Sequence, residues 1–418
     1  MIDLAQMPVD VERLTSELEE LSNFSETTPP AITRVLFTAP DMAMRKWLRG
    51  KCAAAGLTIR EDACGNIFAR WAGSEPDLAA VATGSHCDAI PNSGKFDGTV
   101  GVLGGLEAIR ALQGAGFNPR RSIELIMFTA EEPTRFGLGC VGSRLMAGAI
   151  DPARADAMLG NDGVSLKDAR TQAGFAGDLK SVELKPGAYN AFVELHIEQG
   201  PMLEKDGLDI GIVTAIAAPA SLRVSFEGEG GHAGAVLMAE RHDALLGAAE
   251  LAIAVEQCAL NSGSPDTVGT VGVFRPFPGA INSIPSRCEI EIDIRDVDEE
   301  PRNITVEGVL LSGQEIAARR GLTMKHEMIN SDPPARCDEA ILAAAENACR
   351  ALEVEWRPMV SRAYHDSLFM ARIAPTAMIF IPCAKGVSHR PDEYSSPDAI
   401  TQGAAVLAFT LAQLSMAD

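Results

Sequence analysis

Residues 78–105 read LAAVATGSHCDAIPNSGKFDGTVGVLGG, and this stretch decides the fold. A short apolar run, 78–83, ends in a loop rich in His, Asp, Gly and Asn, and small residues suited to a helix follow from about 99 to 113. A nearly continuous apolar strand of this kind is typical of a sheet that is buried on both faces. The stretch therefore predicts a strand, a polar loop and a helix of an α/β fold.

Three further apolar runs have the same form: 123–129 (IELIMFT), 191–195 (AFVEL) and 376–382 (TAMIFIP). Residues 10–23 and 40–55 have apolar residues at helical spacing, with Asp41 near the start of the second helix. Because short buried strands alternate with helices, we expect a mostly parallel sheet with helices on both faces.

The middle of the chain has a different pattern. It predicts a β-α-β-β-α-β order, which is that of a ferredoxin-like unit. The expected elements are strands at 221–227, 267–274, 287–295 and 322–329 and helices at 240–256 and 303–319. We therefore expect residues 212–329 to form an inserted α+β domain, and residues 1–211 and 330–418 to form one discontinuous α/β domain.

The composition excludes several classes of protein. With 36 Lys and Arg against 57 Asp and Glu, the 418-residue chain has a net charge of −21, so we expect no nucleic-acid or membrane partner. No segment reaches the roughly 18 unbroken apolar residues of a membrane span. The N-terminus is acidic where a leader peptide would be basic, and the nine Cys form no CxxC motif. These features favour a cytoplasmic protein.

Each of the four apolar runs is followed by residues that bind metals. They are His86, Asp88 and Asp97 after the first run, Glu131 and Glu132 after the second, His196 after the third and His389 after the fourth. Ligands of open α/β sheets bind beyond the carboxyl ends of the strands, so these side chains should meet at one edge. Imidazole and carboxylate together suit Zn, Mn or Co. We expect Asp88 to orient the His86 ring, and Glu131 to take a proton from an activated water.

Each of these residues also has a structural alternative. A single His is often an ordinary loop residue, an adjacent Glu pair is often solvated, and Asp97 is suited to cap the following helix. Gly137, Gly139 and Gly142 spell GxGxxG, so an NAD-binding oxidoreductase is the alternative from a different class. No strand directly precedes these glycines, which favours a tight loop into a helix at 143–149.

Several motifs resemble those of a known family. They are the 84–105 stretch, TAEEPTRFG (129–137), ELHIEQGPMLE (194–204), GGHAGAVLM (230–238), GAINSIP (279–285) and SHRPDEYSSPD (388–398). Together they resemble the amidase/hydantoinase/carbamoylase branch of the dinuclear metallo-aminoacylase and peptidase superfamily. This branch contains N-carbamoyl-L-amino-acid hydrolases, allantoate amidohydrolases and ureidoglycolate amidohydrolases. The resemblance runs from about residue 10 to the C-terminus.

The resemblance implies a role for each predicted metal ligand. His86, Asp97 and His196 would bind one ion, and Asp97, Glu132 and His389 a second, with Asp97 as the bridge. Glu131 would be the general acid and base. Two divalent ions per subunit are implied, with Mn²⁺ expected and Zn²⁺, Co²⁺ and Ni²⁺ as alternatives.

The resemblance also implies substrate-binding residues. In a homodimer, His232 and Asn282 would reach the site from the partner subunit, and the inserted domain would serve as lid and dimerisation surface. Arg295 would hold a substrate carboxylate, and Gln199 would assist. Without the family, Arg295 would be assigned to a salt bridge with Asp293 or Asp296, and His232 to a glycine-rich turn.

Finer sequence differences favour one branch member. EEPTRFG, HAGAVLM and SRAYHDSLFMARI are similar to ureidoglycolate amidohydrolase, whereas carbamoylases read EEGxRF, HAGTTPM and GAGHDA. Tyr364 stands where those enzymes have Gly, so we expect it to line an altered pocket together with His365. The implied reaction converts ureidoglycolate to glyoxylate, ammonia and carbon dioxide. N-carbamoyl-L-amino-acid hydrolysis and allantoate hydrolysis are the alternatives within the family.

Overall fold

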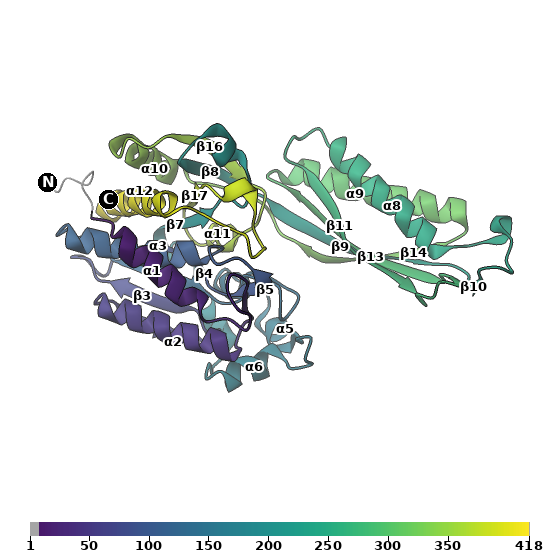
Figure 1. Ribbon diagram of the computed structural model, residues 1–418, viewed down its shortest axis with the longest axis horizontal. Coiled ribbons are helices and arrows are strands. Elements are labelled where there is room, and N and C mark those ends of the chain that lie inside the picture. The colour runs from purple at the N-terminus through teal and green to yellow at the C-terminus, as the bar shows by residue number, and fades with distance from the viewer. Residues whose placement is uncertain (1–7, 418) are drawn as a thin grey trace. The chain divides into compact units, whose positions relative to one another are not determined.

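The computed structural model describes residues 8–417, which divide into two compact units (Figure 1). Unit 2 comprises Ala215–Ala335 and Val360–Tyr364, and unit 1 comprises the other described residues. The division differs slightly from the expected insertion at 212–329, because residues 330–335 and 360–364 also pack with unit 2. The chain therefore passes between the units four times.

Unit 1 is built on a nine-stranded sheet with the order β15-β8-β17-β7-β4-β6-β3-β2, and β16 pairs with β8. Its strands are β2 (Thr58–Glu61), β3 (Ile67–Trp71), β4 (Ala80–His86), β6 (Ile123–Phe128), β7 (Tyr189–Ile197), β8 (Ile210–Ile216), β15 (Ala335–Arg336), β16 (Trp356–Ser361) and β17 (Thr376–Ile381). Strands β1 (Ile32–Arg34) and β5 (Ala89–Ser93) form a separate antiparallel pair.

The α/β fold class is confirmed, but the sheet is mixed. Strands β17, β7, β4 and β6 are mutually parallel, as expected from their apolar runs. The pairs β17–β8, β3–β6 and β2–β3 are antiparallel. Sequence reasoning missed β2 and β3 because they are joined by a short turn and carry polar side chains, so they lack the fully apolar pattern of the central strands. It also missed β8, although IGIVTAI is an apolar run.

Helices cover both faces of this sheet. Helices α3 and α12 lie side by side on one face (Figure 1). The helices of unit 1 are α1 (Val11–Ser22), α2 (Ala39–Ala54), α3 (Thr99–Gly114), α4 (Val141–Met146), α5 (Pro152–Ala157), α6 (Leu166–Gln172), α7 (Met202–Asp206), α10 (Glu339–Ala351), α11 (Asp366–Met370) and α12 (Pro397–Met416), with 3-10 turns η2 (Leu179–Val182) and η4 (Ala384–Gly386).

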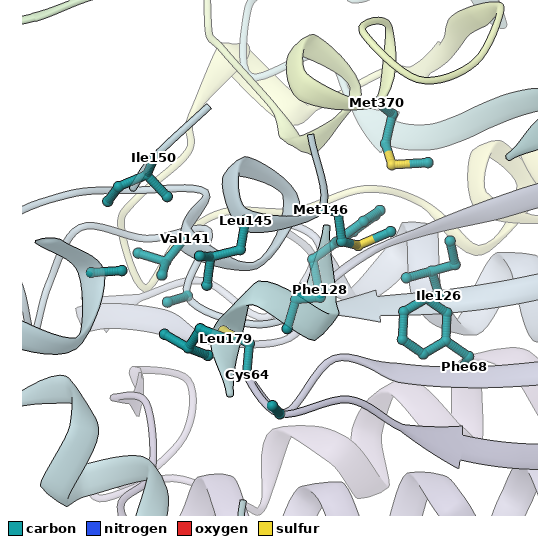
Figure 2. Packing of buried hydrophobic residues seen from close by; sticks show 14 of the residues in the cluster. Cys64, Phe68, Ile126, Phe128, Val141, Leu145, Met146, Ile150, Leu179 and Met370 are labelled. Carbon is teal, nitrogen blue, oxygen red and sulfur yellow. The ribbon is translucent and has the colours of Figure 1, made fainter. Parts of the chain in front are cut away.

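An apolar cluster covers the opposite face of the sheet. Figure 2 shows Phe128 and Ile126 of β6 among side chains from α4, η2 and α11, including Leu145 and Met370. Phe128 and Met370 are fully buried. Since the loop that follows β6 carries Glu131 and Glu132, this packing sets the position from which that loop starts.

Helix α12 is long and apolar enough to cross a membrane by length and composition. Within the protein, 67% of its most apolar window is buried, and it packs against α3 and α10. This burial is that of a core helix.

Unit 2 contains a four-stranded antiparallel sheet with the order β11-β13-β9-β14. Its elements are β9 (Ala218–Glu227), β10 (Gly231–His232), η3 (Met238–Glu240), α8 (Ala244–Leu260), β11 (Val268–Phe277), β12 (Ser283–Ile284), β13 (Arg287–Asp296), α9 (Glu299–Arg320) and β14 (Thr323–Ser331). Apart from the short β10–β12 pair, they follow the expected β-α-β-β-α-β order. Alternate residues of β9 and β13 are buried against α8 and α9.

Candidate metal centre

The carboxyl ends of four neighbouring strands place the predicted donors at one edge of unit 1. In the parallel register His86 pairs with Phe128, and His196 pairs with Phe380. His86 ends β4 and His196 lies near the end of β7, whereas Glu132 and His389 lie in the loops after β6 and β17. The order β17-β7-β4-β6 therefore brings together residues up to three hundred positions apart.

Asp97 lies at the centre of the donor side chains. Its Oδ1 atom is 3.1 Å from His196 Nε2 and 3.5 Å from His86 Nε2. Its Oδ2 atom is 3.3 Å from His389 Nε2, which is also 3.4 Å from Glu132 Oε1. In each of the two groups, His86–Asp97–His196 and Asp97–Glu132–His389, the donor atoms lie within 4.8 Å of one another. The structure thus brings together all five residues predicted as metal ligands.

The hydrogen bonds of the imidazole rings test whether this donor set fits a cation. Nδ1 of His86 lies 3.0 Å from the Asp88 carbonyl oxygen, and Nδ1 of His196 lies 2.9 Å from the Ile197 carbonyl oxygen. A carbonyl accepts only, so in each ring Nδ1 carries the proton and the neutral ring presents a lone pair at Nε2. The Gly98 N–H donates to His196 Nε2 at 3.2 Å, in agreement. Two such lone pairs face one carboxylate oxygen, and a cation satisfies all three groups.

The pKa values of these groups follow from burial and mutual attraction. Burial alone would raise the pKa of Asp97, but the hydrogen bonds that it accepts from the three imidazole groups, when Nε2 of each carries a proton, hold this pKa well below its usual value. Burial and the Asp97 charge raise the pKa of Glu132 to about 7. The hydrogen bond to Asp97 raises the pKa of His389 to about 9. Without a cation, protons therefore take the cation's place in this cluster.

Glu131 lies beside the donor groups. Its Oε2 atom is 3.7 Å from His86 Nε2, and Cys140 Sγ donates to Oε1 at 3.6 Å. Burial, together with the neighbouring charges of Glu132 and Asp366, raises the pKa of Glu131 well above its usual value. A carboxyl group of this kind is suited to accept and return a proton near neutral pH.

Asp88 acts differently from the prediction. We expected its carboxylate to orient His86, but the backbone carbonyl of Asp88 does so, and the carboxylate oxygen is 3.7 Å from Nδ1. The carboxylate accepts the backbone N–H groups of Glu131 at 3.3 Å and Glu132 at 3.0 Å. Asp88 therefore ties the loop after β4 to the loop after β6.

The helix-capping alternative for Asp97 is wrong. Gly98 is the N-cap of α3 and has φ +67°, and the Asp97 side chain faces the imidazole rings instead. A Cβ atom on Gly98 would lie 2.4 Å from the His86 ring, so only glycine fits beside this ring.

The remaining predicted residues of unit 1 also lie at this edge. Gln199 donates from Nε2 to Asp97 Oδ2 at 2.7 Å, and its buried Oε1 atom has no partner among the described residues. His365 is 2% exposed, and its ring centroid is 4.5 Å from that of His196.

The predicted residues of unit 2 are more open to solvent. His232 and Asn282 are exposed, and the β10–β12 pairing joins the segments that carry them. The Gly234 N–H donates to Nδ1 of His232 at 3.1 Å, which leaves the proton of the neutral ring on Nε2. Arg295 donates to Asp293 at 2.6 Å, which is the salt bridge expected for it without the family resemblance. Its guanidinium lies 5.3 Å from the centre of the Tyr364 ring.

Sequence reasoning missed a layer of buried polar residues behind the site. Glu194 accepts from the hydroxyl groups of Ser85 at 2.6 Å and Ser367 at 2.5 Å. Arg34 is fully buried and donates to the Cys87 carbonyl oxygen at 2.6 Å, and Glu393 accepts three hydrogen bonds near Asp97. The one available signal was a charged residue inside an apolar run, as with Glu194 in AFVEL.

Comparisons with known proteins identify the family of this chain. The model of "Peptidase family M20/M25/M40" matches residues 82–413. A ureidoglycolate hydrolase of Oryza sativa subsp. japonica is 57% identical over 98% of this chain and 85% of its own. An N-carbamoyl-L-amino acid amidohydrolase of Geobacillus stearothermophilus is 38% identical over 97% of this chain and 99% of its own. The crystal structures of AtUAH in complex with (S)-hydroxyglycine and with glyoxylate share 55% identity and a TM-score of 0.91, covering 99% of each chain.

These matches decide between the two enzyme classes considered. The NAD-binding alternative is wrong, since Gly137 and Gly139 lie in the loop between Glu132 and α4 and the matched family is one of hydrolases. The family model covers the residues of the donor groups and most of both units. The chain belongs to peptidase family M20/M25/M40, and its fold and recognisable motifs are those of an amidohydrolase of that family.

Proposed function

We propose that this enzyme hydrolyses the ureido group of ureidoglycolate to give glyoxylate, ammonia and carbon dioxide. The observation that carries the proposal is the pair of donor groups that share Asp97, with Glu131 beside them. The substrate is supported by the 57% identity to a ureidoglycolate hydrolase and by the hydroxyglycine and glyoxylate complexes of AtUAH.

The family is metal-dependent, and the donor set suits two divalent ions per subunit. His86, Asp97 and His196 would hold one ion, and Asp97, Glu132 and His389 the other, with Mn²⁺ as the expected metal and Zn²⁺, Co²⁺ and Ni²⁺ as alternatives. When bound, these ions supply a Lewis acid for the ureido carbonyl and lower the pKa of water.

The proton transfers fall to Glu131. It takes a proton from the attacking water, and the water oxygen forms a bond to the ureido carbon. Glu131 then returns the proton to the departing nitrogen as the C–N bond breaks. This cleavage releases ammonia and leaves a carbamate, which loses carbon dioxide as its own C–N bond breaks to give hydroxyglycine. Hydroxyglycine then loses a second ammonia to give glyoxylate.

Substrate binding falls mainly to unit 2. Arg295 presents a planar fork for the substrate carboxylate, already oriented by Asp293 and Tyr364. His232 would donate from Nε2 to the ureido carbonyl oxygen. Asn282 would bind the substrate carboxylate with Arg295, while Gln199 and His365 would assist from unit 1.

We also propose that unit 2 serves as lid and dimerisation domain and that His232 and Asn282 act on the site of the partner subunit. Two features support this role. Strand β11 is an edge strand of the unit 2 sheet, and α8 exposes Ile253 (62%) and Leu260 (74%). We further propose that the enzyme is cytoplasmic, since all nine of its cysteines are free thiols.

A substrate panel tests the proposal. Purified enzyme is reconstituted with Mn²⁺ and, separately, with Zn²⁺, and kcat/KM is measured for ureidoglycolate, allantoate and several N-carbamoyl-L-amino acids. We expect ureidoglycolate to give the highest kcat/KM with either metal. A higher value for an N-carbamoyl amino acid or for allantoate would overturn the substrate assignment in favour of that alternative.

A further inference from the structure

Glu393 is a buried carboxylate next to the donor groups, and neither the proposed metal binding nor the proposed proton transfer uses it. It is 5% exposed, and its two oxygens are fully engaged. Oε1 accepts the backbone N–H groups of Phe96 at 2.8 Å and Asp97 at 3.1 Å. Oε2 lies 2.9 Å from the Ser388 hydroxyl, which is also 2.8 Å from Asp97 Oδ2.

These contacts join two loops that are distant in the sequence. One loop carries Asp97 and the other carries His389, and both residues belong to the second donor group. Glu393 itself belongs to neither donor group among the described residues. It therefore touches the backbone and the hydroxyl group that hold the ligands in place, while the ligands face the cation.

The packing around Glu393 is tight. A Cβ atom on Gly94 would lie 2.3 Å from the Cβ atom of Glu393. The Phe96 and Tyr394 rings meet edge to face with centroids 6.0 Å apart. His389 has φ +59°, a left-handed conformation that costs a non-glycine residue free energy and persists when its surroundings determine it. The contacts of Glu393 and Ser388 provide such surroundings.

The burial of Glu393 has a cost that these contacts offset. A third carboxylate beside Asp97 and Glu132 adds repulsion to a site that is already acidic, and desolvation adds further cost. Nothing in the apolar core requires a carboxylate at this place. The carboxylate accepts hydrogen bonds from the backbone N–H groups of Phe96 and Asp97, which an apolar side chain could not do.

We propose that Glu393 is a positioning residue that holds Asp97 and His389 at the separation needed to bind the second metal ion. This role parallels that of Asp88, which holds the backbone of Glu131 and Glu132. The inference deepens the proposed function, since it rests on the proposed pair of metal ions. Glu393 acts through Asp97 and Ser388 and makes no contact with substrate in this role.

The test measures metal binding to metal-free protein. Each variant is titrated with Mn²⁺ against a chelating dye, which gives the number of ions and the affinity for each. We expect Glu393→Ala to lower the affinity for one of the two ions by about 10- to 100-fold, the usual effect of losing a hydrogen-bond partner of a metal ligand. Glu393→Gln should recover most of this loss, because its amide oxygen still accepts the backbone N–H groups and its amide N–H can donate to Ser388.

Further variants reach the same contact from other sides. Ser388→Ala removes the hydroxyl group that joins Glu393 to Asp97, and Gly94→Ala adds a Cβ atom that would clash with Glu393. Both variants should lower the affinity for the same ion. Asp392→Ala is the matched control, since its carboxylate is 59% exposed and pairs with Arg390 on the surface. It should bind both ions as the unmodified enzyme does. At limiting Mn²⁺, kcat of Glu393→Ala should fall with KM unchanged, and excess Mn²⁺ should restore kcat.

Several outcomes would overturn the inference. Unchanged affinity for both ions in Glu393→Ala and Ser388→Ala would do so, as would equal losses in Asp392→Ala. If Glu393→Ala does not fold, as judged by circular dichroism, the metal affinities of Ser388→Ala and Gly94→Ala test the inference instead. An unmodified enzyme that binds no second ion would overturn the proposed metal pair as well, whereas one that binds two ions and hydrolyses ureidoglycolate confines the failure to Glu393.

Discussion

The donor residues of unit 1 and the expected substrate-binding residues of unit 2 are built in opposite ways. Asp97 and His196 are buried, and hydrogen bonds and ion pairs with neighbouring groups orient both side chains. His232 and Asn282 are exposed, and the backbone near them is ordered by the short β10–β12 pairing and by turn hydrogen bonds such as that from the Ala233 N–H to the Asn282 carbonyl oxygen. Burial perturbs the pKa values of the unit 1 groups before any substrate arrives. In the proposed dimer, the unit 2 residues would acquire comparable surroundings only when substrate or a partner subunit meets them.

This contrast has consequences for mutants. Substitutions in unit 1 should change metal content or proton transfer, because those residues interact mainly with one another. Substitutions in unit 2 should leave the metals in place and change substrate binding and assembly.

Asp97→Ala should give the largest effect. It removes the carboxylate shared by both donor groups, so both ions should be lost and kcat should fall by at least about 10³-fold. Elemental analysis and steady-state assays measure the two effects. Asp162→Ala, which removes an exposed carboxylate paired with Arg135, is the control. A variant of Asp97 that keeps both ions would show that the cluster does not depend on the shared residue.

Glu131→Gln should separate chemistry from metal binding. The amide cannot accept and return a proton, so kcat should fall by about 10²- to 10⁴-fold, while the metal content stays at the level of the unmodified enzyme. Metal content and kcat are measured on the same preparation. A parallel loss of metal and activity would instead make Glu131 a ligand.

Mixing two inactive variants tests the role of unit 2 across subunits. Glu131→Gln and His232→Ala each disable one component of the site, and we expect each to have little activity alone. In a mixed dimer one site receives both intact residues, so an equal mixture that exchanges subunits should regain about a quarter of full activity. Activity of the mixture is compared with that of each variant. No recovery, despite subunit exchange shown by mass spectrometry, would place His232 in the site of its own subunit.

Proton release on metal binding should give the smallest effect. In metal-free protein the pKa of His389 is raised to about 9 and that of Glu132 to about 7, so both hold protons to higher pH than usual. A cation must displace these protons, and apparent affinity should therefore rise with pH and level off above about pH 9. Calorimetry near pH 7.5 in buffers of different ionisation enthalpy counts the released protons. Binding heats that do not depend on the buffer would contradict the raised pKa values.

The central strands and the donor residues were predictable from the sequence because each is a local pattern. An apolar run followed by His86, or by Glu131 and Glu132, is visible within about ten residues. The parallel order of the strands then brings these ends together without further information. The expected helix at 240–256 was nearly right, but α8 begins at Ala244 because Asp243 caps it and Met238–Glu240 forms a separate turn.

The supporting residues were not predictable in this way. Glu393 and Asp97 are 296 residues apart, and nothing near Glu393 in the sequence indicates that its carboxylate binds the Asp97 backbone. Arg34 reads as a surface residue, yet it is fully buried against backbone carbonyls. The antiparallel pairings of β17 with β8 and of β3 with β6 were missed for the same reason, since pairing between distant strands is decided by the whole fold.

The position of β17 in the sheet bears on how the chain is made. β17 lies between β8 and β7, although about 160 residues, including nearly all of unit 2, are synthesised after β8 and before β17. The sheet therefore cannot join β7 to β8 through β17 until Thr376–Ile381 has been synthesised. His389 follows that strand by a few residues, so the second donor group can be completed only near the end of translation.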